Sequence, residues 1–293
     1  MTAQVDLAIL GGSGFYTMPG LSDVDEIAIE TPFGSPSDRV RIGTLGGRRV
    51  AFLARHGRAH TLLPSEIPQR ANFWALKSLG VSRVLAVSAV GSLREEFRPG
   101  EFVIPDQLID RTRGTRPATF FGDGVVAHVG FGEPFCPRLR ADLATAANRG
   151  GFLAHTGSTY VVIEGPAFGT RAESDVYRGW GAGIVGMTAL PEAKLAREAE
   201  ICYAILAAVT DYDSWRAGES AVTASTVFEV LAANVQAGQK VVKGLAASPL
   251  AGSCPCGTTL DSALVTPVRA IPDVSRARLQ PILARRLGAA ANP

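Results

Sequence analysis

Two aspartates, Asp211 and Asp213, follow an apolar run that covers residues 201–209. A run of this kind is typical of a buried strand, and the acids mark the point where that strand reaches the edge of its sheet. Residues two apart in an extended chain point to the same side, so both carboxyl groups share one face. Open α/β sheets bind ligands at the carboxyl ends of their strands, where a carboxyl group with a raised pKa can donate a proton. A solvated strand end or a helix-capping Asp is the plainer interpretation.

Three other apolar runs end in groups that can hold an anion. Residues 11–14, Gly-Gly-Ser-Gly, follow the first run and offer backbone N–H groups and a hydroxyl. Arg55 and His56 end another run with a fork of donors and an imidazole. Ser88 and Ala89 form the third strand end, with a hydroxyl and neighbouring N–H groups. Each alone is equally consistent with a tight turn or ordinary surface residues, but together they suit a phosphate held without a metal.

Composition excludes several classes of function. The 293 residues are 46% hydrophobic with a net charge of +2, and no Lys/Arg cluster dominates any segment, so we expect no nucleic-acid partner. The first residues lack the basic flank and apolar stretch of a signal peptide. No apolar run approaches the roughly 20 residues that span a bilayer. We therefore expect a soluble, cytoplasmic protein of one or two domains, without a membrane partner.

The four cysteines, Cys136, Cys202, Cys254 and Cys256, form no paired C-x-x-C spacing, and no H-E-x-x-H motif is present. The sequence thus predicts no metal site. Cys202 lies within an apolar run and is expected to pack in the core. The Cys254-Pro255-Cys256 segment is interpreted as structural or incidental, with a vicinal disulfide-like or redox role as the alternative.

Strand-like and helix-like segments alternate along the chain, which predicts an α/β fold with a mixed central sheet flanked by helices. Strands are expected near residues 5–10, 26–30, 39–45, 49–54, 84–91, 101–109, 159–166, 183–187 and 201–213. Helices are expected near residues 65–79, 137–147, 171–180, 191–200 and 223–245. Residues 1–247 are assigned to one domain. Residues 248–293, rich in Ser, Pro, Gly and Thr at first, are assigned to an irregular extension with a short helix near 275–287.

A series of motifs, in order from about Ile9 to about Val241, resembles the S-methyl-5'-thioadenosine phosphorylases of the purine nucleoside phosphorylase family. The motifs are GGSG at 11–14, TPFGSPSD at 31–38, LARHGRAH at 53–60, AVGSLREE at 89–96, EPFCP at 133–137, EGPAF at 164–168, RAES at 171–174, MT at 187–188, and TDYD at 210–213 with Trp215. A series of this length is far more specific than any one motif.

This resemblance implies a single-domain purine nucleoside phosphorylase-like fold, a homotrimer, and attack of phosphate on the anomeric carbon of a nucleoside. Phosphate is a co-substrate, and no cofactor or metal is implied. The implied phosphate-binding residues are Ser13, Arg55, His56, Ser88, Ala89 and Thr188. Those implied for the nucleoside are Phe168 against the purine, Met187 under the ribose, Asp211 and Asp213 at the base, and Ala224, Val227 and Phe228 at the 5' end, with His128 from an adjoining subunit. Asp211, Asp213 and Ser13 are the implied catalytic residues.

The chemistry of the residues agrees with these roles. The departing purine gathers negative charge, so a carboxylic acid near N7 lowers the barrier by roughly 3–5 kcal/mol. A carboxylate accepts hydrogen bonds from a 6-amino group, whereas a 6-oxo group would leave buried acceptors unpaired at roughly 1–3 kcal/mol each. Adenine is therefore the predicted base, and the resemblance implies phosphorolysis of S-methyl-5'-thioadenosine, in methionine and purine salvage. The alternatives are a 6-oxopurine nucleoside or methylthioinosine phosphorylase, a hydrolytic nucleosidase, and a non-catalytic nucleotide-binding module. Without the resemblance, the stripe formed by Ala224, Val227 and Phe228 would be interpreted as core packing, which is the usual meaning of such spacing.

Overall fold

The computed structural model describes residues 5–12, 14–15, 17–216, 224–250, 252 and 254–289, and gives only the backbone of residues 224–228, 231, 233 and 289. Within these residues, eleven strands form one sheet. They are β1 (Leu7–Gly11), β2 (Ser22–Ile27), β3 (Val40–Leu45), β4 (Arg48–Ala54), β5 (Arg83–Ser92), β6 (Phe102–Ile104), β7 (Gln107–Arg111), β8 (Ala154–Thr156), β9 (Thr159–Ile163), β10 (Ile184–Gly186) and β11 (Cys202–Asp211).

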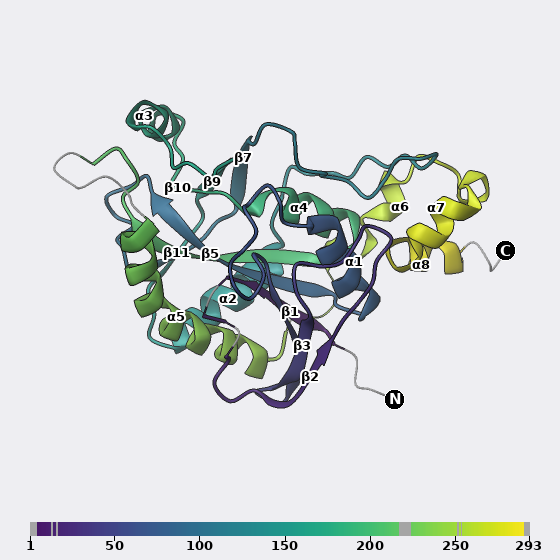
Figure 1. The fold of residues 1–293 in the computed structure, drawn as a ribbon, viewed down its shortest axis with the longest axis horizontal. Coiled ribbons are helices and arrows are strands. Elements are labelled where there is room, and N and C mark those ends of the chain that lie inside the picture. Colours follow the sequence, from purple (N-terminus) through teal and green to yellow (C-terminus); the bar gives the residue numbers. More distant parts are fainter. Residues whose placement is uncertain are drawn as a thin grey trace.

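The helices flank this sheet and continue beyond it (Figure 1). They are α1 (Gln69–Ser78), α2 (Pro137–Arg149), α3 (Arg171–Gly179), α4 (Ala189–Glu198), α5 (Ala224–Ala247), α6 (Leu260–Ala263), α7 (Asp273–Arg278) and α8 (Gln280–Ala289), with 3-10 turns at Pro255–Thr258 and Val268–Ala270. Among the described residues, no helix combines the length and apolar character needed to cross a bilayer.

The sheet is mixed, as the sequence predicts. β1 pairs in parallel with β4 and β5, and β5 pairs in parallel with β11. β3 runs antiparallel to β2 and β4, and β10 runs antiparallel to β5. The carboxyl ends of β1, β4 and β11 therefore meet at one edge of the sheet, where open α/β sheets bind ligands.

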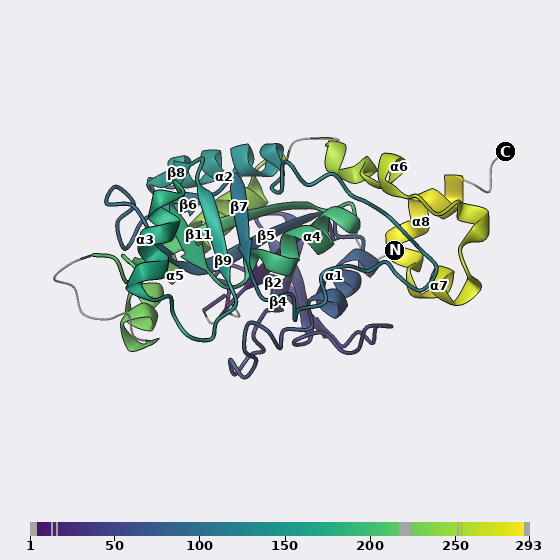
Figure 2. The ribbon, with the colours of Figure 1, turned by 90° about the horizontal axis from the view of Figure 1, so that it is seen from above.

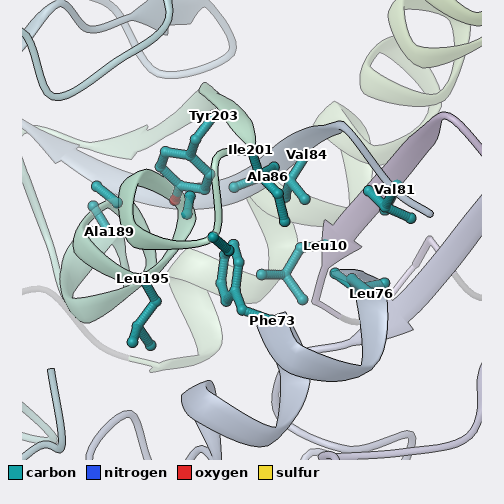
Figure 3. Packing of buried hydrophobic residues seen from close by; sticks show 14 of the residues in the cluster. Leu10, Phe73, Leu76, Val81, Val84, Ala86, Ala189, Leu195, Ile201 and Tyr203 are labelled. Atoms are coloured by element: carbon teal, nitrogen blue, oxygen red, sulfur yellow. The ribbon is translucent and has the colours of Figure 1, made fainter. Parts of the chain in front are cut away.

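Both faces of the sheet are covered, which explains why its central strands are apolar throughout. Along β1, Leu7 and Ile9 join a core cluster with residues of α2 and α5, while Ala8 and Leu10 join a second cluster with residues of α1 and α4. Figure 3 shows this second cluster, in which Phe73 of α1 lies close to Leu10. The alternation of side chains thus divides β1 between two cores.

The segment after residue 247 packs on the core with more regular structure than one short helix. Leu279, Ile282 and Leu283 belong to the α1-side cluster, and Trp74 Nε1 of α1 donates to Arg278 O at 2.9 Å. The helical region expected near 275–287 is divided between α7 and α8. In Figures 1 and 2 these helices lie at one end of the molecule, with α3 toward the other.

A long connection between β7 and α2, residues 112–136, reaches this C-terminal region (Figure 2). Val126 N donates to Thr266 Oγ1 at 2.8 Å, and His128 N donates to Ala263 O at 2.8 Å. On the core side, Glu198 of α4 accepts bonds at 2.7 Å from Thr119 Oγ1 and Phe120 N. The middle of the connection is therefore held both to the core and to the C-terminal region.

Several expected boundaries were wrong. The strand expected at residues 84–91 corresponds to β5, but the strand end assigned to Ser88 and Ala89 was wrong, because β11 pairs with β5 through Ala89 and Val90, and β10 pairs with Gly91 and Ser92. The expected strand at residues 101–109 is two strands, β6 and β7, and β8 was not anticipated. The first helix begins at Gln69 rather than residue 65, because Pro68 disfavours a helical conformation for the residue before it.

Candidate active site

The strand ends surround a cavity of about 400 Å³, a volume typical of small-molecule sites. Its lining combines residues from the first half of the chain with residues from the second. Of the predicted site residues, those that line it are Arg55, His56, Ser88, Ala89, Phe168, Met187, Thr188, Asp211 and Asp213. The expected convergence of separate strand ends is thus a feature of the fold.

Backbone N–H groups become available here because β1 is shorter than β5. β1 pairs with β5 only as far as Leu10 opposite Ala86. Beyond this point Val87 O accepts a bond from Arg55 Nη1 at 3.1 Å instead of from a strand. Backbone groups alternate along a strand, so the N–H of Ala89 faces the same side as Val87 O. A residue without a polar side chain, Ala89, can therefore still offer a backbone N–H donor to the cavity.

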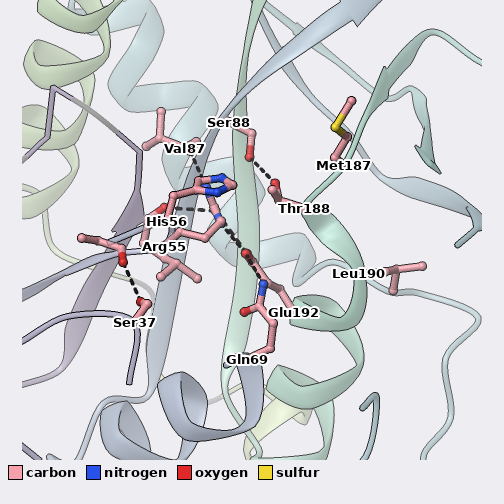
Figure 4. A network of polar contacts seen from close by, with 12 residues as sticks. Ser37, Arg55, His56, Gln69, Val87, Ser88, Met187, Thr188, Leu190 and Glu192 are labelled. Carbon is pink, nitrogen blue, oxygen red and sulfur yellow. Dashed lines mark hydrogen bonds and ion pairs between the residues drawn. The ribbon is translucent and has the colours of Figure 1, made fainter. Parts of the chain in front are cut away.

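Arg55 is fixed from several directions (Figure 4). Its Nε donates to Glu192 Oε1, and its Nη2 donates to Glu192 Oε2 at 3.2 Å. The second N–H of Nη2 donates to Leu10 O, also at 3.2 Å. With the bond to Val87 O, four of its five N–H groups are used; the other, on Nη1, has no acceptor among the described residues. Burial alone would lower the pKa of Arg55, but the Glu192 carboxylate outweighs burial and raises it. The result is a permanent, oriented charge in the cavity wall.

Glu192 is fully buried in α4 and accepts two further bonds. Gln69 Nε2 donates to its Oε1 at 3.3 Å, and Tyr203 Oη donates to its Oε2 at 2.7 Å. A buried charge is tolerated only when it is paired and hydrogen-bonded. Glu192 meets this requirement and leaves Arg55 no freedom to turn away from the cavity.

His56 is neutral at pH 7. Burial, and then the charge of Arg55, lower its pKa to about 4. Its Nδ1 lies 2.8 Å from Leu62 O, and since a carbonyl can only accept, Nδ1 carries the proton. Nε2 is therefore an acceptor, suited to the protonated oxygen of a hydrogen phosphate. His60 stacks on the His56 ring with centroids 4.4 Å apart and lines the same cavity.

Two hydroxyls, those of Ser88 and Thr188, face one another in the cavity wall (Figure 4). Ser88 Oγ of β5 and Thr188 Oγ1 are 3.2 Å apart, and both side chains are buried. Thr188 is the N-cap of α4, yet its side chain makes no capping bond. Its hydroxyl is therefore directed to Ser88 and the cavity rather than to the helix.

Asp211 and Asp213 both line the cavity, although the extended-strand argument was wrong for the second. β11 ends at Asp211, and Asp213 lies in a turn with φ of 51°. Asp213 N donates to Asp211 Oδ1 at 2.7 Å, so the tight turn itself brings the two residues together. Thr210 Oγ1 donates to Asp211 Oδ2 at 2.7 Å, and Ser174 Oγ donates to Asp213 Oδ2. Burial raises the pKa of Asp213 despite the bond from Ser174.

The remaining predicted residues lie elsewhere or outside the description. Phe168 is 42% exposed at the cavity rim, where a planar ligand can cover it. His128 is exposed on the connection of residues 112–136 and is not among the residues that line this cavity. Ser13 lies outside the described residues. Ala224, Val227 and Phe228 belong to the first turns of α5, and their side chains lie outside the described part of the chain.

Comparisons with known proteins agree with this geometry. Residues 6–247 match the model of the phosphorylase superfamily. The chain is 51% identical over 286 residues to the S-methyl-5'-thioadenosine phosphorylase of Koribacter versatilis, covering 97% of this chain and 98% of the relative. The chain belongs to the S-methyl-5'-thioadenosine phosphorylase family.

Solved structures show the same fold. A methylthioadenosine phosphorylase from an antarctic soil metagenomic library is 48% identical, with a TM-score of 0.90 over 95% of this chain and 99% of that one. The Schistosoma mansoni methylthioadenosine phosphorylase, solved in complex with adenine, is 37% identical, with a TM-score of 0.77 over 83% of this chain and 91% of that one. The predicted family and fold class are confirmed.

Within this phosphorylase fold, sequence reasoning missed the residues that hold the site in place. Glu192 and Ser174 orient Arg55 and Asp213, and Tyr160 packs its hydroxyl against Gly186 in the cavity wall. The available signal for Glu192 was an acid between apolar residues, Leu190 and Pro191 before it and Ala193 after it, in the first turn of its helix. Ser174 lies in the RAES motif at residues 171–174, but nothing in the sequence connects it to Asp213, 39 positions further along the chain.

Proposed function

We infer that this enzyme catalyses the phosphorolysis of S-methyl-5'-thioadenosine to adenine and 5-methylthioribose 1-phosphate. The observation that carries this inference is the cavity itself, which holds the fixed charge of Arg55 and the carboxyl pair of Asp211 and Asp213. A phosphate oxygen forms a bond to C1' while the C1'–N9 bond breaks, and the electron pair stays with the purine. The cationic and carboxyl groups match the two charged partners of this reaction.

We assign the phosphate to Arg55, His56, Ser88, Thr188 and the backbone N–H of Ala89. Ser13, in the Gly-rich turn after β1, is proposed to add a hydroxyl. The unused Nη1 hydrogen of Arg55 and the acceptor Nε2 of neutral His56 together suit a hydrogen phosphate dianion. Held beside the ribose, the dianion also stabilises the positive charge that develops at C1'.

We assign the base to the aspartates, with Asp211 at N7 and Asp213 at the 6-amino group. Thr210 supports this division because its one hydroxyl proton has two acceptors, Asp211 Oδ2 at 2.7 Å and Val90 O at 3.2 Å. When Asp211 is protonated, it donates to Thr210 Oγ1, which then donates to Val90 O, and every group is satisfied. The arrangement therefore accommodates a proton on Asp211, ready for the leaving purine.

We propose a homotrimer, in which His128 of one subunit reaches the 5' end of a nucleoside bound by another. Exposure of His128 on a connection outside its own cavity supports this assignment. Met187, beside the ribose, and the first turns of α5, with Ala224, Val227 and Phe228, are proposed to complete the sugar site. Residues 1–247 then form the catalytic domain, and residues 248–293 form an extension packed on it. We expect the enzyme in the cytoplasm.

One assay tests the proposal. Adenine release from S-methyl-5'-thioadenosine is measured by chromatography with and without phosphate, with inosine and methylthioinosine as competing substrates. We expect strict dependence on phosphate, and kcat/KM at least about 100-fold higher for the 6-amino nucleoside. Faster cleavage of inosine or methylthioinosine would favour a 6-oxopurine phosphorylase. Cleavage without phosphate would favour a hydrolase, and binding without turnover would leave only a nucleotide-binding module.

A further inference from the structure

The fold brings together all four cysteines of the chain. Cys136 is the N-cap of α2, Cys202 is the first residue of β11, and Cys254 and Cys256 flank Pro255 at the 3-10 turn. Their Sγ atoms all lie within 4.8 Å of one another, with 3.4 Å between Cys136 and Cys254 and 3.6 Å between Cys254 and Cys256. Three separate parts of the sequence thus contribute to one cluster of sulfur atoms.

The arrangement matches a tetrahedral metal site. A Zn–S bond is about 2.3 Å, so sulfur atoms around zinc lie roughly 3.8 Å apart, within the range that the cluster already spans. Thiolates select zinc and other soft or borderline metals. We propose that Cys136, Cys202, Cys254 and Cys256 together bind one Zn²⁺ ion. The sequence missed this site because its ligands follow no paired C-x-x-C spacing.

The surroundings suit bound thiolates. Cys136, Cys202 and Cys256 are buried, which shields a metal–sulfur site from water. The backbone N–H of Leu139 lies 3.5 Å from Cys136 Sγ, and the positive end of the 13-residue helix α2 favours negative charge at its N-cap. Binding replaces four S–H protons by one Zn²⁺ and releases those protons, so the step needs no oxidant or reductant.

The site is structural rather than catalytic. Four protein ligands close the coordination of zinc and leave no position for water or substrate. Cys202 begins β11 and Asp211 ends it, so about 30 Å separates the metal from the carboxyl pair. The ion connects the segment after residue 247 to α2 and β11 and stabilises the packing of the C-terminal extension on the core.

Metal content provides the first test. The full-length protein, without an affinity tag, is purified anaerobically with a thiol reductant, reconstituted with Zn²⁺ and desalted. We expect one zinc per chain, four thiols that react only after chelation or denaturation, and a lower Tm after chelation. Co²⁺ in place of zinc should give the visible and charge-transfer bands of a tetrahedral thiolate site, with an end point at one equivalent. A metal content below a tenth of an equivalent, together with four reactive thiols, would overturn the proposal.

Variants provide the second test. Cys254→Ser and Cys256→Ser should each lose at least nine-tenths of the bound zinc, whereas Thr258→Ala, on the same turn, should retain both the zinc and the activity. Zinc retained by both serine variants would contradict the site, as would disulfides among these cysteines found by mass spectrometry in the reduced, zinc-reconstituted protein. If the variants fail to fold, the cobalt titration of the unmodified protein still decides.

Discussion

Glu192 Oε2 accepts a hydrogen bond at 3.2 Å from Arg55 Nη2, and both side chains are almost completely buried. Arg55 follows β4 whereas Glu192 lies in α4, so the ion pair joins two elements 137 residues apart. The carboxylate offsets the cost of burying the guanidinium and holds it in one orientation. We therefore propose that Glu192 positions Arg55 for phosphate, although Glu192 is not among the residues that line the cavity.

Replacing Glu192 by Gln should chiefly affect phosphate. The amide retains the shape but not the charge, so Arg55 loses its fixed position and the KM for phosphate should rise about tenfold, equivalent to about 1.4 kcal/mol. Initial rates at varied phosphate and varied nucleoside measure this effect. Glu200→Gln is the matched control, because Glu200 is also a buried glutamate paired with an arginine, the exposed Arg285, away from the cavity. An equal rise in the nucleoside KM, or the same change in the control, would remove the positioning role.

The two aspartates should respond differently to replacement by Asn. Asp211→Asn cannot deliver a proton to N7, so kcat should fall about 100-fold while Tm changes little. Asp213→Asn should mainly reduce the preference for 6-amino over 6-oxo nucleosides, because an amide can donate to a 6-oxo group. Asp175→Asn, on the exposed face of α3, is the control. An unchanged kcat in Asp211→Asn would exclude Asp211 from the chemistry.

Features of the site that depend on local sequence were predictable. The apolar runs that end in Arg55 and Asp211 identified strand ends correctly, because a strand buried on both faces contains few polar residues until it ends. The position of Ser88 was not predictable in the same way. Small residues after it suggested a strand end, but pairing with β11 and β10 extends β5 to Ser92. Local pattern cannot reveal a pairing partner more than 90 residues away.

Features that depend on long-range packing were not predictable from the residues alone. The bond between Ser174 and Asp213 joins α3 to a turn with positive φ, where the expected extended chain would have placed Asp213 differently. The cysteine cluster joins Cys136 to Cys254 across 118 residues. In both cases each residue type was visible, but only the tertiary fold determines which groups meet.

Gly186 should tolerate no side chain while Tyr160 keeps its hydroxyl. A Cβ at Gly186 would lie 2.2 Å from Tyr160 Oη, and the fully buried ring cannot move aside. Gly186→Ala should therefore lower Tm by several degrees and displace the cavity wall, reducing kcat/KM. Adding Tyr160→Phe should restore part of the lost Tm and part of the lost kcat/KM, because the ring carbon nearest to the new Cβ would then be 3.0 Å away. Gly179→Ala, with open space around the new methyl, should be neutral. Equal losses in the single and double variants would refute the steric explanation.

Glu198 should make the stability of the protein depend on pH. Burial raises its pKa to about 7, although Phe120 N and Thr119 Oγ1 donate to it. Between its ordinary pKa and pH 7 the folded protein therefore holds a proton that the unfolded chain has released, so stability falls as pH rises through this range. The full effect above pH 7 is about 3 kcal/mol.

Comparison with Glu198→Gln isolates this effect, because the amide does not titrate. We compare the Tm values of the variant and the unmodified protein by calorimetry. The difference, variant minus unmodified, should increase by several degrees between pH 5 and pH 8, because only the unmodified protein loses this stability as pH rises. Exposed Glu96→Gln should show no such increase. A difference that stays constant with pH would mean that Glu198 is already ionised at pH 5. Its bonds to Thr119 and Phe120 would then act as ordinary contacts of the connection that carries His128.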